Sequence, residues 1–233
     1  MLKNSNNSSP GLMICTMLSV SFLCLAMILT YRVISFGFFL APGGVLVFPL
    51  TYIFADIVAE TYGYRNAKLL ILGNYFCIVA FNIVGYLLIQ LPVPPNVLYE
   101  EIFDYLFAHA FTVTFAYGLG FLFGDLINAY VISKWQTLVK GKYFVMRSVG
   151  SSIIGLIIFN VVASITIYSS QLSLGQLARQ FLTTITIKAV VIILLAYPAY
   201  LVVILLRKSE KLQPYDITQE PDAFSVFSYK ELD

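Results

Sequence analysis

Two carboxylates lie one helical turn apart in a stretch that is otherwise apolar. Asp56 and Glu60 occur within VLVFPLTYIFADIVAETYGY, which has the length and composition of a membrane span. A spacing of four residues places both side chains on one face of a helix. Ionisable side chains are costly inside a bilayer, and they usually face a bundle interior or a water-filled path. The pair therefore predicts a polar solute site built into the helices of a membrane transporter.

Further polar groups lie deep in other apolar stretches and extend this predicted site. Asp125 and Asn128 are three residues apart and so share nearly one helix face. Asn160 and Lys188 fall in two later stretches. A deep lysine requires a counter-charge, and Asp56 and Asp125 are the candidates. The predicted substrate-binding set is Asp56, Glu60, Asp125, Asn128, Asn160 and Lys188.

Each of these groups also has a structural interpretation. Lys188 and one aspartate would then form a buried ion pair without a role in binding. Glu60 lies near the end of its apolar stretch and would pair there with Arg65. Serines in membrane helices usually bond to their own backbone, so Ser151 and Ser152 receive little weight as site residues.

The composition places the chain in a membrane. Hydrophobic residues make up 59% of its 233 residues and charged residues 11%, with a mean hydropathy of +0.85. Soluble domains carry about 25% charged residues. A span needs roughly 20 apolar residues, and six such segments fit, over residues 12–33, 42–62, 67–91, 108–132, 148–169 and 183–206. We expect an all-α integral membrane protein, with six transmembrane helices in one domain over residues 1–207 and a short cytoplasmic tail over 208–233.

Basic residues set the expected topology, because lysine and arginine concentrate in short cytoplasmic loops. If the N-terminus is inside, the outer segments hold only Arg32 and Arg179. The cytoplasmic segments then hold Lys3, Arg65, Lys68, Lys134, Lys140, Lys142, Arg147, Arg207, Lys208, Lys211 and Lys230. Both termini are therefore predicted to be cytoplasmic.

Two further patterns point to a paired, closely packed arrangement. FADIVAETY at 54–62 is weakly echoed by FGDLINAY at 123–130. Transporters often contain internal repeats that meet at a binding site near the bilayer midplane. Gly120 and Gly124 form a GxxxG step, which lets another helix approach closely. Pro49 and Pro198 each interrupt a span and are expected to distort it near the site.

Three blocks stand out between about residue 40 and the tail: FPLTYIFADIVAETYGYRNAK at 48–68, GDLINAYV at 124–131 and RSVGSSIIG at 147–155. Together they resemble the vitamin uptake transporter family, in its queuosine precursor transporter branch. Lys188, Pro198 and the tail from Glu210 resemble the C-terminal portion of that family. After the third block the family usually has an acidic or amide residue and then an Asp. Here Leu156 and Phe159 stand at those places, with Asn160 the nearest polar group.

The resemblance implies a multi-pass protein of the bacterial inner membrane. Its implied role is the import of 7-cyano- or 7-aminomethyl-7-deazaguanine, or queuine, for tRNA queuosine salvage. A guanine edge offers N1–H and N2–H donors side by side, and one carboxylate can accept both. We expect Asp56 or Asp125 to be that acceptor, with the other free to balance Lys188. Aromatic side chains suit base stacking, and the chain has 16 Tyr and 19 Phe.

A second function class stays open, the substrate-binding membrane subunit of an ATP-driven vitamin-type importer. The chain has no GxxxxGK[ST] loop, so that ATPase would be a separate chain. An enzyme ranks last, because HExxH, GxSxG and metal-ligand clusters are missing from the sequence. We expect no catalytic residues, metal or cofactor. The expected partners are a modified purine base and the lipid bilayer, not nucleic acid, and a homodimer stays open.

Overall fold

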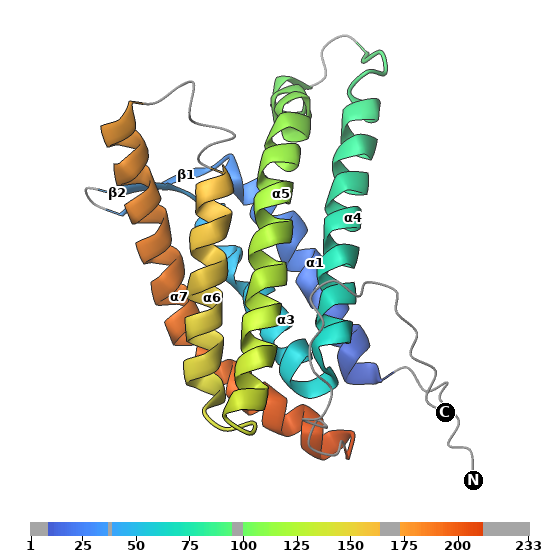
Figure 1. The fold of residues 1–233 in the computed structure, drawn as a ribbon. Helices are drawn as coiled ribbons and strands as arrows, with labels where there is room; N and C mark the ends of the chain where they lie inside the picture. The colour runs from blue at the N-terminus through green and yellow to red at the C-terminus, as the bar shows by residue number, and fades with distance from the viewer. Residues whose placement is uncertain (1–8, 37–38, 95–99, 164–172, 212–233) are drawn as a thin grey trace.

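The protein folds into a bundle of long helices with one short hairpin. A computed structural model describes residues 9–36, 39–94, 100–163 and 173–211 (Figure 1). Most of the tail predicted over 208–233 lies outside these residues. The elements, in chain order, are α1 (Pro10–Thr30), β1 (Val33–Phe36), β2 (Phe39–Pro42), α2 (Gly44–Val47), α3 (Pro49–Tyr62), α4 (Tyr64–Leu88), α5 (Glu100–Leu138), α6 (Phe144–Ala163) and α7 (Leu174–Ser209).

The chain is mainly helical, as predicted, but the expectation of an all-α protein is wrong at one place. Strands β1 and β2 form an antiparallel hairpin between the first two helical segments, with Val33 opposite Pro42 and Phe36 opposite Phe39. Aromatic and β-branched residues in these strands fit a pleated surface. The first helix therefore ends at Thr30, before the end of the predicted span at residue 33.

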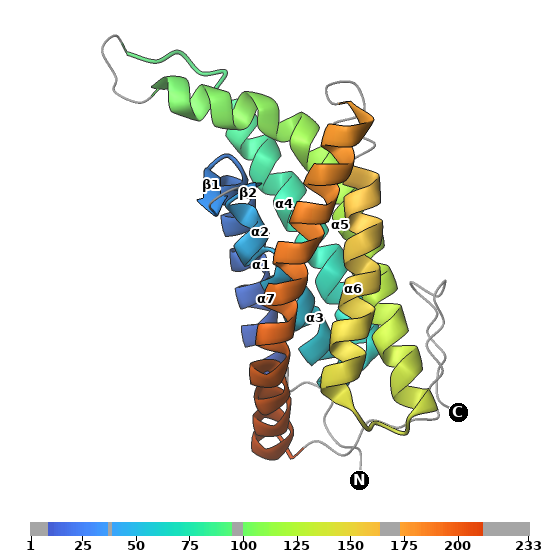
Figure 2. The same ribbon diagram turned by 90° about the vertical axis from the view of Figure 1, so that its left-hand side faces the viewer.

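Five of the described helical segments are long and apolar enough to cross a membrane: Pro10–Thr30, Gly44–Tyr62, Tyr64–Leu88, Phe144–Ala163 and Leu174–Ser209. They correspond to five of the predicted spans, although the ends differ, most of all for the last helix, which begins at Leu174 and not at residue 183. The remaining predicted span, 108–132, lies inside α5, which is 39 residues long. The first part of α5 runs obliquely to the rest of that helix (Figure 2). A crossing by α5, and with it the total of six, stays a prediction.

The outer surface of the bundle is apolar along most helices. Large exposed side chains include Leu18 on α1, Phe76 and Leu88 on α4, and Leu194 and Leu205 on α7. An exposed apolar surface of this extent is not tolerated in water but is the normal surface of a helix in hydrocarbon. These faces therefore suit a lipid environment, as expected for an integral membrane protein.

The first and last described helices meet at one end of the bundle. The Gly11 N–H donates to the Glu210 carboxylate at 2.7 Å, and the hydroxyls of Ser9 and Tyr62 donate to the same group. The α3–α4 junction at Gly63 and the α5–α6 turn also lie at this end (Figure 1). We call it the basic end, because these segments contain most of the lysines and arginines predicted to be cytoplasmic. Its assignment to the cytoplasm stays a prediction.

Helix α3 forms the core of the bundle. Nearly all of its residues are buried, and it contacts α1, α4, α5, α6 and α7. Pro49 occupies its first turn, where a missing N–H costs nothing. Gly63 ends it with φ 86°, a conformation that favours glycine, so that α4 can begin at Tyr64. The interior position of α3 explains why its carboxylates are buried.

Helices α5 and α6 pack at very short range through glycines. A methyl group at Gly124 would lie 2.7 Å from the Gly155 carbonyl oxygen, and one at Gly120 would lie 3.0 Å from the Phe159 carbonyl oxygen. The close approach predicted from the GxxxG step is thus confirmed, with α6 as the partner helix. It brings the polar residues of α5 against those of α6.

Candidate functional site

Asp56 is a buried carboxylate whose two oxygens both accept hydrogen bonds. Its Oδ1 accepts from Asn128 Nδ2 on α5 at 2.8 Å. Its Oδ2 accepts from the Ser148 hydroxyl at 2.5 Å and from the Ser152 hydroxyl at 3.1 Å, both on α6. The side chain is fully buried. Asp56 therefore joins α3 to α5 and α6, at the level where the two glycine-rich helices touch.

Glu60, one turn further along α3, is held by two arginines at the basic end. Arg147 NH1 lies 2.9 Å from Glu60 Oε2, and Arg207 NH2 lies 3.0 Å from Oε1. Arg147 is itself buried and also donates to backbone carbonyls of the α5–α6 turn at Gly141 and Lys142. The ion pairs shown for Glu60 are thus with Arg147 and Arg207, two arginines that were not expected as its partners from the sequence. Glu60 acts in a structural ion-pair network.

Asp125 is different, because neither of its carboxylate oxygens has a hydrogen-bond partner among the described residues. The side chain is fully buried on α5. The Tyr52 hydroxyl lies beside it, but neither group forms a hydrogen bond of normal geometry. The Asn128 Oδ1 atom is likewise buried and without a partner. Buried polar atoms are nearly always paired in native proteins, so such a cluster calls for an explanation.

Lys188 of α7 is buried next to this cluster, with 4% of its surface exposed. Its Nζ atom lies 4.0 Å from the ring centre of Phe159 and 4.7 Å from that of Phe48, within the range of cation–π attraction. Asp125 is the carboxylate that acts on its charge, yet the two form no direct ion pair in the described part of the chain. Direct pairing of Lys188 with Asp125 or Asp56 is not found among the described residues, so the expected counter-charge stays a prediction, with Asp125 the better candidate.

A small cavity lies beside Lys188. It measures about 50 Å³ and is lined by Phe48, Phe159, Asn160, Thr184 and Lys188, with residues of α1, β2 and α2 on the other side. The Asn160 amide donates to the Leu156 carbonyl oxygen at 2.7 Å. A water molecule occupies about 30 Å³ in the liquid, so the cavity is too small for a bicyclic base. Access for such a solute requires the lining helices to separate.

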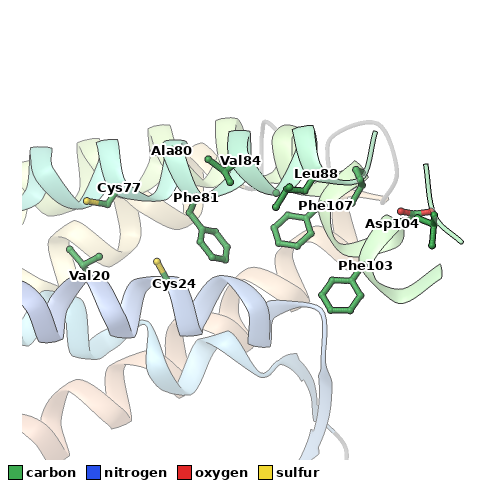
Figure 3. A pocket seen from close by; sticks show the side chains of 13 residues that line it. Val20, Cys24, Cys77, Ala80, Phe81, Val84, Leu88, Phe103, Asp104 and Phe107 are labelled. Atoms are coloured by element: carbon green, nitrogen blue, oxygen red, sulfur yellow. The ribbon is translucent and has the colours of Figure 1, made fainter. Parts of the chain in front are cut away.

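A much larger hollow of about 760 Å³ lies elsewhere, between α1, α4 and the start of α5 (Figure 3). Its lining is almost wholly apolar, with Cys24 and Cys77 at one end and Asp104 at the other. It offers few polar groups to orient a solute, and its walls include the lipid-facing side of α4. The polar cluster is therefore the better candidate for a solute site.

The blocks that contain this cluster also determine the family. The family model of vitamin uptake transporters matches residues 42–203, from the end of β2 to the last turns of α7. The chain belongs to this family. No curated protein and no solved structure matches it.

Membership in the vitamin uptake transporter family and the apolar helices together identify a membrane transporter. All six residues predicted for the site lie inside the matched range. The structure brings Asp56, Asp125 and Asn128 into one cluster, and it places Lys188 and Asn160 on the adjoining cavity. Glu60 is set apart from them in its arginine network.

Two serines on α6 of this vitamin uptake transporter, Ser148 and Ser152, contact Asp56 but were missed as site candidates. Ser151 does bond to the backbone, at the Ser148 carbonyl oxygen, as expected. Ser152 does not, because its hydroxyl donates to Asp56 together with that of Ser148. The spacing of four residues between Ser148 and Ser152 places both hydroxyls on one helix face, and that signal was present in the sequence.

Proposed function

We propose that the protein imports a queuosine precursor, a 7-deazaguanine base, across the bacterial inner membrane. The observation that supports this is the buried Asp125 carboxylate, whose two oxygens have no hydrogen-bond partner among the residues that the structure describes. An unsatisfied buried acceptor costs about 1–3 kcal/mol. A solute with two adjacent N–H donors removes that cost, and the N1–H and N2–H edge of a guanine-type base has this form.

The surroundings of Asp125 suit the rest of such a base. The rings of Phe48 and Phe159 lie with their centres 4.7 Å apart and form an aromatic surface for stacking. The Lys188 ammonium can donate to the base carbonyl, which is next to the N1–H group that would face Asp125. Phe159 stands where the family usually has an acid, so this chain places a ring where a polar side chain is usual.

The test is uptake of a labelled 7-deazaguanine base into vesicles that contain the purified protein alone. Asp125→Asn replaces one acceptor oxygen by a donor, and we expect uptake to fall at least roughly tenfold. Asp104→Asn, in the apolar hollow, is the matched control and should transport normally. Normal uptake by Asp125→Asn would remove Asp125 from the site.

The substrate itself is tested by growth rescue. A queuosine-auxotrophic bacterium that lacks its own importer is given the protein and each base in turn: 7-cyano-7-deazaguanine, 7-aminomethyl-7-deazaguanine and queuine. Rescue by at least one base is expected, and failure of all three would overturn the substrate class. Uptake by the protein alone without ATP would also exclude an obligatory ATPase partner.

A further inference from the structure

The side-chain amide of Asn128 has two ends in different surroundings. Its Nδ2 donates to Asp56 Oδ1 at 2.8 Å, whereas its Oδ1 is buried and has no hydrogen-bond partner in the described part of the chain. Asn128 follows Asp125 by three residues on α5, so the two side chains share one helix face. The unpartnered oxygens of both residues therefore belong to one local surface.

The orientation of this amide follows from the chemistry of Asp56. An ionised carboxylate only accepts hydrogen bonds, so it attracts the amide NH₂ and repels the amide oxygen. The hydroxyls of Ser148 and Ser152 both donate to the other oxygen of Asp56, so this carboxylate acts as an acceptor toward α6 as well as toward α5. With Nδ2 held by Asp56, the Oδ1 atom of Asn128 is turned away from that carboxylate and can accept a hydrogen bond from a solute.

We propose that Asp56 is a positioning residue that turns Asn128 into a hydrogen-bond acceptor. Asn128 Oδ1 and the two oxygens of Asp125 then form an acceptor edge, with the Tyr52 hydroxyl beside it. This inference rests on the proposed function and deepens it, because it names which groups of the base are read. The edge selects a planar solute with several N–H donors on one side, as the N1–H and 2-amino group of a guanine-type base supply.

The decisive experiment exchanges donor and acceptor between the two positions. In Asp56→Asn the serine hydroxyls take the new amide oxygen, so that the new NH₂ faces Asn128. Asn128 must then turn its oxygen toward position 56 and its NH₂ toward the solute. We expect the KM for uptake to rise between about five- and 150-fold, with the protein still inserted and folded.

The paired variant Asp56→Asn with Asn128→Asp restores the contact in reverse. The amide at position 56 donates to the carboxylate at position 128, whose second oxygen again accepts from the solute. We expect the KM to return to within a few fold of the native value. A KM that stays as high as in Asp56→Asn alone would overturn the positioning role, because a direct contact of Asp56 with the solute cannot be rescued from position 128.

A second measurement keeps the proposal testable if the paired variant does not fold. In the native protein, 7-deazaguanine should compete for uptake better than 7-deazahypoxanthine, which lacks the 2-amino group, by about five- to 150-fold. Asn128→Leu should reduce this competition ratio between the two bases. Asn74→Leu is the control and should leave the ratio unchanged, because Asn74 is a buried asparagine that bonds to Ser19 on α1. Equal competition in the native protein, or an unchanged ratio in Asn128→Leu, would contradict the acceptor edge.

Different outcomes would overturn the proposed function and the positioning role of Asp56. If Asp125→Asn abolishes uptake but the paired variant is not rescued, the proposed function stands and the role of Asp56 does not. If no deazaguanine base competes at all, the proposed function itself is wrong.

Discussion

Glu60 and Asp125 are both buried carboxylates in this bundle, and their surroundings are opposite. Glu60 has an arginine on each oxygen, whereas neither oxygen of Asp125 has a hydrogen-bond partner in the described residues. The first arrangement ties α3 to α6 and α7 at the basic end. The second leaves two carboxylate oxygens able to accept hydrogen bonds in the middle of the bundle, which lowers the stability of the folded state. The difference separates a carboxylate that is satisfied within the fold from one for which we propose a role in solute binding.

Asp56 lies between the two along the bundle and combines their properties. Its oxygens are satisfied, as those of Glu60 are, but by an amide and two hydroxyls instead of cations. Neutral donors therefore fix its position, and Asp56 joins α3 to α5 and α6 without the cations that hold Glu60.

The largest effect is expected from Arg147→Met at the basic end. This change strands one oxygen of Glu60 and frees the carbonyls of the α5–α6 turn, and breaking a buried pair costs about 3–5 kcal/mol. The detergent-extracted yield and the melting temperature should both fall sharply. Arg207→Met is the control, because Arg207 is 32% exposed and its loss should cost less. Equal stability of Arg147→Met and the native protein would break the contrast between Glu60 and Asp125.

Gly124→Ala tests whether the glycine contact of α5 and α6 aligns the polar cluster. A methyl group there meets the Gly155 carbonyl oxygen, and overpacking of this kind costs about 1–3 kcal/mol. We expect uptake to fall by a larger factor than the stability loss alone explains, because Asp125 is the next residue. Gly73→Ala on α4 is the matched control, since a methyl group there meets no atom within 4 Å. If both variants transport equally, the close approach is not needed for the site.

Lys188→Met tests the comparison of Glu60 with Asp125 by removing the buried cation near Asp125. Lys188 has no direct ion pair in the described part of the chain, so its removal strands no salt-bridge partner. We expect uptake to be lost while the free energy of unfolding stays within roughly 1 kcal/mol of the native value or rises. Thermal melting and vesicle uptake on one preparation measure both. A large loss of stability would show that Lys188 and Asp125 are a structural pair like Glu60 and its arginines.

The smallest effect concerns Glu210, which lies just beyond α7 at the basic end. Burial raises the pKa of this carboxyl, but hydrogen bonds from Ser9, Gly11 and Tyr62 outweigh it and leave the pKa below its ordinary value of 4.5. The folded state therefore prefers the carboxylate. Its contribution to stability is complete above the ordinary pKa and is lost as the pH falls through the lowered one. The native protein should melt slightly above Glu210→Gln at pH 7.

Acid should remove that advantage. Melting curves of both proteins between pH 7 and strongly acidic pH measure it, and the two melting temperatures should converge as Glu210 protonates. A gap that is constant with pH would show that the carboxylate form of Glu210 is not what joins α1, α3 and α7.

The sequence predicted the depth of the polar residues better than their partners. Hydropathy and the spacing of Asp125 and Asn128 correctly indicated one polar face, and the echo between 54–62 and 123–130 joined two segments that do touch, through Asp56 and Asn128. The choice of Arg147 instead of Arg65 for Glu60 depends on how α3 and α6 are rotated toward each other. Helical periodicity defines a face but not the neighbour that it meets, so that choice could not be derived.

Two other differences have local causes. The hairpin of β1 and β2 lies in an apolar run that hydropathy alone cannot distinguish from a helix end, although its aromatic and β-branched residues favour strands. Ser152 was discounted, and Ser148 was not considered, because an isolated helix offers a serine only its own backbone. In the bundle, Asp56 is the stronger acceptor, and α6 lies close enough for both hydroxyls to reach it.

Helix α7 contains both Lys188 and Arg207, and Pro198 lies between them. Proline has no N–H, so the Leu194 carbonyl oxygen loses its helical hydrogen bond, and helices bend most readily at such a point. The bending stiffness of α7 is therefore lowest about midway between the lysine near the solute site and the arginine that closes the basic end. A force that tilts one half of α7 is only partly transmitted to the other half. Mechanically, α7 therefore consists of two stiff helical segments joined by a hinge at Pro198.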